Sequence, residues 1–221
     1  QYSVIERPRP AHTHIRVAVR RWRRRNIVGH RGGTASGADA MQRVGVLRYE
    51  IAAAGHHHML LVGSPGAGKT TYGKRLAAAS GAVFLDIDTA TERLVRLSLR
   101  QSGGDPDDRD SAAFKQTYRD PIYEQLFDIA CDNLPFNSVV ITGPFTRELL
   151  DADWPRKVSR RLGVPAEIHY VFCRPEVRKK RLLARANARD RSKLESWANY
   201  LDYYADEAPP CFDHVFVEGD G

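Results

Sequence analysis

Residues 63–70 of this chain read Gly-Ser-Pro-Gly-Ala-Gly-Lys-Thr, which fits the pattern G-x-x-x-x-G-K-[ST]. The apolar run 59–62 precedes this stretch, and the helical pattern of residues 71–79 follows it. Glycines allow backbone N–H groups to surround a phosphate, and the start of a helix adds partial positive charge. A strand, a glycine loop and a helix in this order therefore predict a phosphate-binding loop rather than an ordinary turn.

The side chains of this loop indicate how a nucleotide would be held. Lys69 is expected to reach the β- and γ-phosphates, and Thr70 to offer its hydroxyl to Mg²⁺. Contacts to the nucleotide are expected from the whole loop and the residue after it: Gly63, Ser64, Pro65, Gly66, Ala67, Gly68, Lys69, Thr70 and Thr71.

The net charge of +7 is concentrated at the start of the chain. Residues 1–40 hold nine arginines against two acids, Glu6 and Asp39, and therefore carry the whole imbalance. We expect residues 1–40 to be a basic extension, disordered or not part of the natural protein, and residues 41–221 to form one domain. Three scattered cysteines and the lack of a long apolar run favour a cytoplasmic protein without a membrane partner.

Short apolar runs alternate with helical patterns after the loop. The runs are 59–62, 82–85, 139–141, 167–172 and 215–217. Helices are expected at 89–100, at 111–119, from Pro121 onward, and at 146–162, 175–188 and 193–208. Thr89 and Glu92 fit a capping box at the start of the first of these helices. The alternation predicts an α/β fold with a five-stranded, mostly parallel sheet covered on both faces.

Acidic side chains follow the second apolar run. Asp86 and Asp88 lie 17 and 19 residues after Lys69, and alternate residues of an extended chain share a face. Because ligands bind beyond the carboxyl ends of parallel strands, we expect both carboxylates near the phosphate loop and near Thr142. One could accept the proton of an acceptor hydroxyl, and Asp86 could join Thr70 as a ligand of Mg²⁺. The alternative for Asp88 is a helix cap.

A row of arginines follows the fourth apolar run. Arg181, Arg185 and Arg189 are spaced by four residues and would share one face of a helix. Guanidinium groups that close over a triphosphate would neutralise the charge that develops during phosphoryl transfer. We therefore expect Arg181 and Arg185 to bind the nucleotide, and Arg185 and Arg189 to act in catalysis. The alternative is a solvated basic surface.

These features resemble the small P-loop kinases related to chloramphenicol phosphotransferase, zeta toxin and gluconate kinase. The resemblance covers residues 59–218 and includes the pattern Arg-x3-Arg-x3-Arg-Asp, here ending at Asp190. It implies the three-layer sandwich of P-loop NTPases with a helical, arginine-rich lid (residues 181–190). It also implies ATP and Mg²⁺ as cofactors, a small-molecule acceptor, and Asp86 or Asp88 as the base.

Two other functions stay open from the sequence. Residues 50–57 resemble the entry segment of magnesium-chelatase-type AAA+ ATPases, so a regulatory ATPase that acts on protein or nucleic acid is one alternative. The third apolar run ends in Thr142-Gly143 without the acid that a motor ATPase uses, which favours a kinase. A polynucleotide kinase is the other alternative, and a nucleic acid would then bind through the basic extension.

The acceptor-binding residues and the oligomeric state are not specified by the sequence. Generic candidates for acceptor contacts are Arg109, Lys115, Tyr118, Arg119, Thr142 and Arg147.

Overall fold

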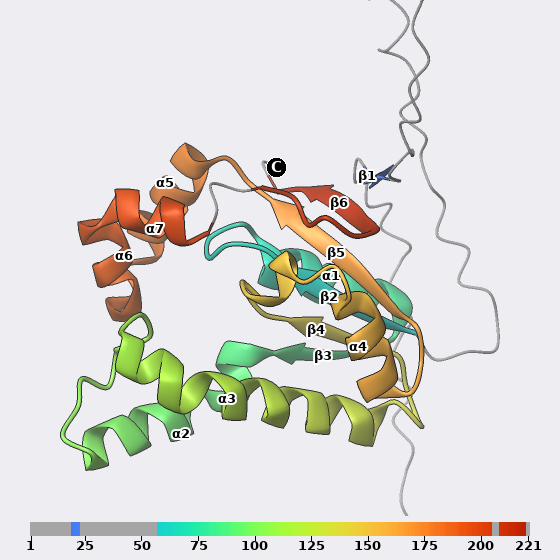
Figure 1. Cartoon of the computed structure of the whole chain (residues 1–221), viewed down its shortest axis with the longest axis horizontal. Helices are drawn as coiled ribbons and strands as arrows, with labels where there is room; N and C mark the ends of the chain where they lie inside the picture. The colour runs from blue at the N-terminus through green and yellow to red at the C-terminus, as the bar shows by residue number, and fades with distance from the viewer. Residues whose placement is uncertain (1–18, 23–56, 205–207, 220–221) are drawn as a thin grey trace, which may run out of the picture.

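The computed structural model describes residues 19–22, 57–204 and 208–219, with a six-stranded sheet at its centre (Figure 1). The strands are β1 (Val19–Trp22), β2 (His58–Val62), β3 (Val83–Asp86), β4 (Val139–Thr142), β5 (Ala166–Phe172) and β6 (His214–Glu218). Their order is β1-β6-β5-β2-β4-β3. Strands β2 to β6 run parallel, as expected, and β1 pairs antiparallel with β6.

Helices cover both faces of this sheet. They are α1 (Lys69–Ser80), α2 (Ile87–Gln101), α3 (Ala112–Asn133), α4 (Trp154–Leu162), α5 (Pro175–Arg185), α6 (Arg191–Glu195) and α7 (Trp197–Tyr203), with 3-10 turns η1 (Glu148–Leu150) and η2 (Ala188–Asp190). Successive side chains of β2 point to opposite faces. Leu60 therefore packs in the core under α3 and α4, and Leu61 in the core under α1. The three-layer sandwich is confirmed.

The register of the sheet brings distant residues to one edge. Asp86, the last residue of β3, is directly paired with Thr142, the last residue of β4. Thr142 is also paired with Leu61 of β2, one residue before the strand ends and the phosphate loop begins. The carboxyl ends of the neighbouring strands β2, β4 and β3 thus lie together at one edge of the sheet, beside the phosphate loop.

The starts of two helices differ from expectation. Helix α2 begins at Ile87, and its N-cap is Asp86, not Thr89; the carboxylate of Asp86 accepts hydrogen bonds from the backbone of Asp88 and Thr89. Helix α3 is one continuous helix that contains Pro121, where the sequence suggests a new start. An internal proline costs about 3 kcal/mol. Burial of Phe114 on one side of it and Leu126 on the other offsets that cost.

Three other helices end or begin elsewhere than expected. Helix α4 starts at Trp154 instead of residue 146, because Pro155 fits only its first turn. Helix α5 ends at Arg185, where Ala186 takes a left-handed conformation with φ 46°. The single helix expected at 193–208 is two short helices that break at Ser196, where φ is −121° and ψ is 57°.

The basic extension is described over four residues only. Val19–Trp22 form β1 at the edge of the sheet, where they pair with β6. The remainder of residues 1–40, and most of the chelatase-like segment 50–57, lie outside the described residues. The domain boundary at residue 40 stays a prediction. Within the described ranges, no helix is both long enough and apolar enough to cross a membrane.

Candidate active site

The phosphate loop joins β2 to α1, and its backbone requires glycine. Gly63, Gly66 and Gly68 have φ values of +131°, +85° and +102°, a region that side chains strongly disfavour. A Cβ atom on Gly63 would lie 2.4 Å from the carbonyl oxygen of Val171 on β5. The strand–loop–helix prediction is confirmed, and the loop is held closely against the neighbouring strand.

Lys69 lies over the loop that precedes it. Its Nζ donates hydrogen bonds to the carbonyl oxygens of Gly63 at 2.8 Å and Ser64 at 2.9 Å. These bonds keep a positive charge at the mouth of the loop, beside the start of α1, where the helix adds its own partial charge. The arrangement is suited to bind a phosphate.

Asp86 is the centre of the phosphate end of the site. Its Oδ2 accepts hydrogen bonds from the hydroxyls of Thr70 at 2.9 Å and Thr142 at 2.8 Å. Its Oδ1 accepts from the backbone N–H groups of Asp88 and Thr89, each at 3.1 Å. The predicted convergence of the loop, Asp86 and Thr142 is therefore present. Because each oxygen already accepts two hydrogen bonds, this buried carboxylate is suited to holding the two threonine hydroxyls and the start of α2 in place.

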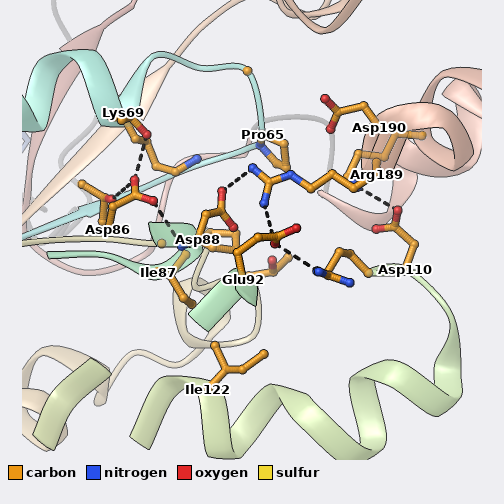
Figure 2. Close-up of a pocket in the computed structure, with 18 of the residues that line it drawn as sticks. Pro65, Lys69, Asp86, Ile87, Asp88, Glu92, Asp110, Ile122, Arg189 and Asp190 are labelled. Atoms are coloured by element: carbon orange, nitrogen blue, oxygen red, sulfur yellow. Dashed lines mark hydrogen bonds and ion pairs between the residues drawn. The ribbon is translucent and has the colours of Figure 1, made fainter. Parts of the chain in front are cut away.

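Asp88 has a different environment. It lies in the first turn of α2, so the expected strand-like alternation with Asp86 does not apply. Its side chain is 53% exposed, and its Oδ2 lies 2.6 Å from Nη2 of Arg189. Figure 2 shows Arg189 reaching between Asp88 and Glu92, and its Nη1 lies 3.3 Å from Oε2 of Glu92. Burial lowers the pKa of Arg189, but the charges of Asp88 and Glu92 outweigh this effect and raise it.

The three lid arginines do not share one helix face, because α5 ends before Arg189. The side chain of Asn187 accepts a hydrogen bond from the backbone of Arg189 and starts the turn η2 instead. Arg181 donates to the carbonyl oxygen of Gly219 at 2.6 Å and to those of Gly66 and Ala67 at 3.4 Å. Arg185 forms a bidentate ion pair with Asp190, whose side chain is 1% exposed.

These elements surround a cavity of about 440 Å³. It is lined by many of the residues predicted from sequence: Pro65, Gly66, Gly68, Lys69, Thr70, Thr71, Asp86, Asp88, Arg181, Arg185 and Arg189. Gly63, Ser64 and Ala67 do not line it, because they are the buried residues of the loop. Of the generic acceptor candidates, Tyr118 and Arg147 also lie outside the lining.

Several lining residues were missed by sequence reasoning. Glu92, expected to complete a helix cap, instead receives Arg109 at 3.0 Å and Arg189 at 3.3 Å. Its position four residues after Asp88 places both acids on one helix face, and this spacing is a signal that could have found it. Asp110, which pairs with Lys193 at 2.7 Å, and Tyr203 of α7 gave no comparable signal.

A magnesium ion is compatible with the groups at the phosphate end. The hydroxyl of Thr70 and the carboxylate of Asp86 are hard oxygen donors that already lie together. Over the described ranges, no group of three or more His, Cys, Asp or Glu side chains gathers as an all-protein metal site. Mg²⁺ in proteins is commonly held by one or two side chains together with substrate phosphates, so the two findings agree.

Comparison with known proteins places this geometry in a family. A family model described as AAA domain matches residues 59–206, which is more than half of the chain. The shikimate kinase of Rhodopseudomonas palustris is 39% identical over 66 residues, which are 28% of this chain and 32% of the relative. The chain thus spans less than one third of the length of that curated relative.

Two solved structures are also similar. A structure from Chloroflexus aurantiacus, described as a proposed kinase, has a TM-score of 0.50 at 15% identity and covers 76% of this chain and 90% of its own. A sugar kinase from Janibacter sp. HTCC2649 has a TM-score of 0.49 at 18% identity and covers 74% and 86%. The first of these likenesses supports the α/β fold. The family model and the matched segment of shikimate kinase confirm the expected resemblance to P-loop kinases.

Proposed function

This chain belongs to the AAA domain family, and we propose that it is an ATP-dependent phosphotransferase that moves the γ-phosphate of ATP to a hydroxyl of a small molecule. The observation that carries this proposal is the continuity of one cavity. Its lining runs from Lys69 of the phosphate loop past Asp88 to side chains of α3. A nucleotide and a second, smaller molecule would therefore meet beside an accessible carboxylate.

The two carboxylates are assigned different roles. Asp86 already accepts four hydrogen bonds, so in this proposal it orients Thr70 and is not the base. Asp88 is half exposed and lines the cavity, so it would accept the proton of the acceptor hydroxyl once Arg189 moves aside. The acceptor oxygen then forms a bond to the γ-phosphorus, and the bond from that phosphorus to the bridging oxygen of ADP breaks.

Positive side chains supply the charge that this transfer needs. Lys69 and Arg181 lie against the phosphate loop, and Arg185 and Arg189 line the cavity from the lid. Thr70, held in place by Asp86, would bind Mg²⁺, which when bound neutralises phosphate charge. Arg189 would leave its carboxylate partners and bind the transferring phosphate. Its charge would stabilise that phosphate most strongly in the transition state.

The proposal is tested by the formation of ADP from Mg-ATP with a panel of hydroxylated small molecules. We expect Lys69→Ala to lower acceptor-dependent kcat/KM by at least about 100-fold. The matched control is Lys74→Ala, because Lys74 lies exposed on the same helix and does not line the cavity. Unchanged turnover in Lys69→Ala would refute the proposal. ADP formation that no acceptor stimulates would favour the regulatory ATPase instead.

A further inference from the structure

The cavity has a second end, formed by α3 and α7, which we call the acceptor end. From α3 it is lined by Lys115, Arg119, Ile122 and Tyr123, and from α7 by Tyr203. Figure 2 shows Ile122 of α3 on the opposite side of the cavity from Lys69. A molecule that receives a phosphate from the loop would therefore contact both apolar and cationic side chains.

Most cations in the lining already have a carboxylate partner. These pairs are Arg109 with Glu92, Arg189 with Asp88 and Glu92, Arg185 with Asp190, Arg119 with Glu148, and Lys193 with Asp110. Lys69 and Arg181 donate to backbone carbonyl oxygens of the phosphate loop, where a nucleotide would bind. The paired cations are therefore balanced by carboxylates, and Lys69 and Arg181 would be balanced by the phosphates of ATP.

Lys115 belongs to neither group. Its Nζ lies 3.7 Å from the centre of the Tyr203 ring. Among the residues that the structure describes, no carboxylate lies within 4.0 Å of this ammonium. A tyrosine ring attracts a cation without cancelling its charge. The acceptor end thus carries a positioned positive charge that lacks an acidic partner in the described part of the chain.

We propose that Lys115 binds an anionic group of the acceptor, either a carboxylate or a phosphate monoester. The enzyme would then prefer acceptors that carry both a hydroxyl and a negative charge over neutral ones. Arg119, one turn along α3, lies over the Tyr123 ring and is held by Glu148 at 2.6 Å, so its guanidinium is a second cationic group at this end. Tyr203 is a positioning residue for Lys115. This inference rests on the proposed function.

The test compares charged acceptors with neutral counterparts. The pairs are shikimate with its methyl ester, gluconate with glucitol, and glucose 6-phosphate with glucose. In the wild-type protein we expect the charged member of at least one pair to be favoured, and Lys115→Gln to lower its kcat/KM about 10- to 100-fold, mainly through KM. The neutral member should change little. Lys157→Gln, which removes a surface lysine outside the cavity, should leave both unchanged.

A second pair of variants separates positioning from mere packing. Tyr203→Phe keeps the ring under Lys115, and Tyr203→Leu removes it. We expect Tyr203→Phe to retain the preference for the charged acceptor and Tyr203→Leu to lose part of it by an increase in KM. Equal losses for charged and neutral acceptors in Lys115→Gln would overturn the inference while leaving the kinase proposal in place.

Binding without turnover distinguishes the two proposals. The same acceptor pairs are titrated calorimetrically into protein that holds Mg-ADP, so that the phosphate loop does not compete for the anion. Preferential binding of a charged member that Lys115→Gln abolishes would support the inference even if no phosphate is transferred, in which case the kinase proposal fails. No binding of any charged member, or equal binding by Lys115→Gln, would overturn the inference.

Discussion

The two ends of the cavity are built by different means. At the phosphate end, backbone N–H groups and one buried carboxylate hold parts that lie close together in sequence, namely residues 63–70 and Asp86, with Thr142 added by the sheet. Around the lid, partly exposed ion pairs join residues about 80 to 100 positions apart, such as Asp88 with Arg189 and Asp110 with Lys193. The phosphate end is thus held by buried hydrogen bonds, whereas the region around the lid is held by partly exposed ion pairs, which contribute less to stability.

Replacement of Asp86 should have the largest effect, because this carboxylate joins Thr70, Thr142 and the start of α2 at the phosphate end. Asp86→Ala loses the cap of α2 and leaves the hydroxyls of Thr70 and Thr142 without their acceptor. We expect the free energy of unfolding to fall by about 3 kcal/mol, together with loss of activity. Urea denaturation measures the first effect. A loss below about 1 kcal/mol would mean that this hub does not hold the phosphate end together.

Replacement of Asp88 should separate activity from stability. Because its side chain is 53% exposed, Asp88→Asn should change the free energy of unfolding by less than about 1 kcal/mol. The kcat of acceptor-dependent ADP formation should nevertheless fall by about 100-fold, since the base is lost. Steady-state kinetics and urea denaturation of the same preparation check both parts. A variant with normal kcat would remove Asp88 from the mechanism.

A smaller effect is expected where α6 is tied to the loop before α3. Asp110→Asn weakens the contacts of Asp110 with Ser192 and Lys193. Backbone amides of α6 and α7 should then exchange hydrogen faster by several-fold, while those of β2 and α1 stay as in the wild type. Asp151→Asn, which weakens a surface pair with Lys157 on α4, is the matched control. Uniformly faster exchange would contradict independent behaviour of the two ends.

The smallest predicted effects are changes of stability with pH that come from two groups outside the cavity lining. Burial lowers the pKa of His58, the first residue of β2, below its ordinary 6.5. The unfolded chain therefore binds the proton more readily, and this contribution to stability is present above pH 6.5 and decreases as the pH falls below it. Urea denaturation at pH 7.5 and 5.5 should show the decrease in the wild type and a flatter response in His58→Gln.

In the loop before α3, which Asp110 joins to α6, the corresponding change occurs in more acidic solution. Burial alone would raise the pKa of Asp108, but hydrogen bonds from Ser111 and from the backbone of Asp110 outweigh it and lower the pKa below 3.8. The stability that Asp108 contributes is thus present above pH 3.8 and decreases as the pH falls through its lower folded value. Hydrogen exchange of the backbone amides of residues 105–111 measures this effect. Faster exchange already at pH 5.5 would contradict the lowered pKa of Asp108.

The same contrast explains what the sequence could predict. The loop 63–70 and the sheet could be read from local patterns, because glycine geometry and alternating apolar runs are properties of short segments. The meeting of Asp86 with Thr142 followed from the rule for parallel strands. The end of α5 and the break between α6 and α7 could not be read, because Ala186 and Ser196 interrupt patterns that were helical by spacing.

The ion pairs around the lid could not be predicted from local sequence patterns, because they join residues that are far apart in the chain. Glu92 fitted a helix cap, and only the fold shows that it lies between Arg109 and Arg189. Lys115 was one of several generic cations until the structure placed it on Tyr203, without a described acid beside it. Long-range ion pairs leave little periodic signal in a sequence, because any surface charge fits such a position equally well.

The fate of the γ-phosphate tests phosphoryl transfer to a small molecule most directly. Wild-type protein and Asp88→Asn are incubated with γ-labelled ATP, Mg²⁺ and a protein-free small-molecule extract that contains added shikimate and gluconate, and the labelled products are separated by chromatography. We expect label in an organic phosphate ester with the wild type and strongly reduced label with Asp88→Asn. Label found only as inorganic phosphate, or equal ester formation by Asp88→Asn, would contradict this expectation.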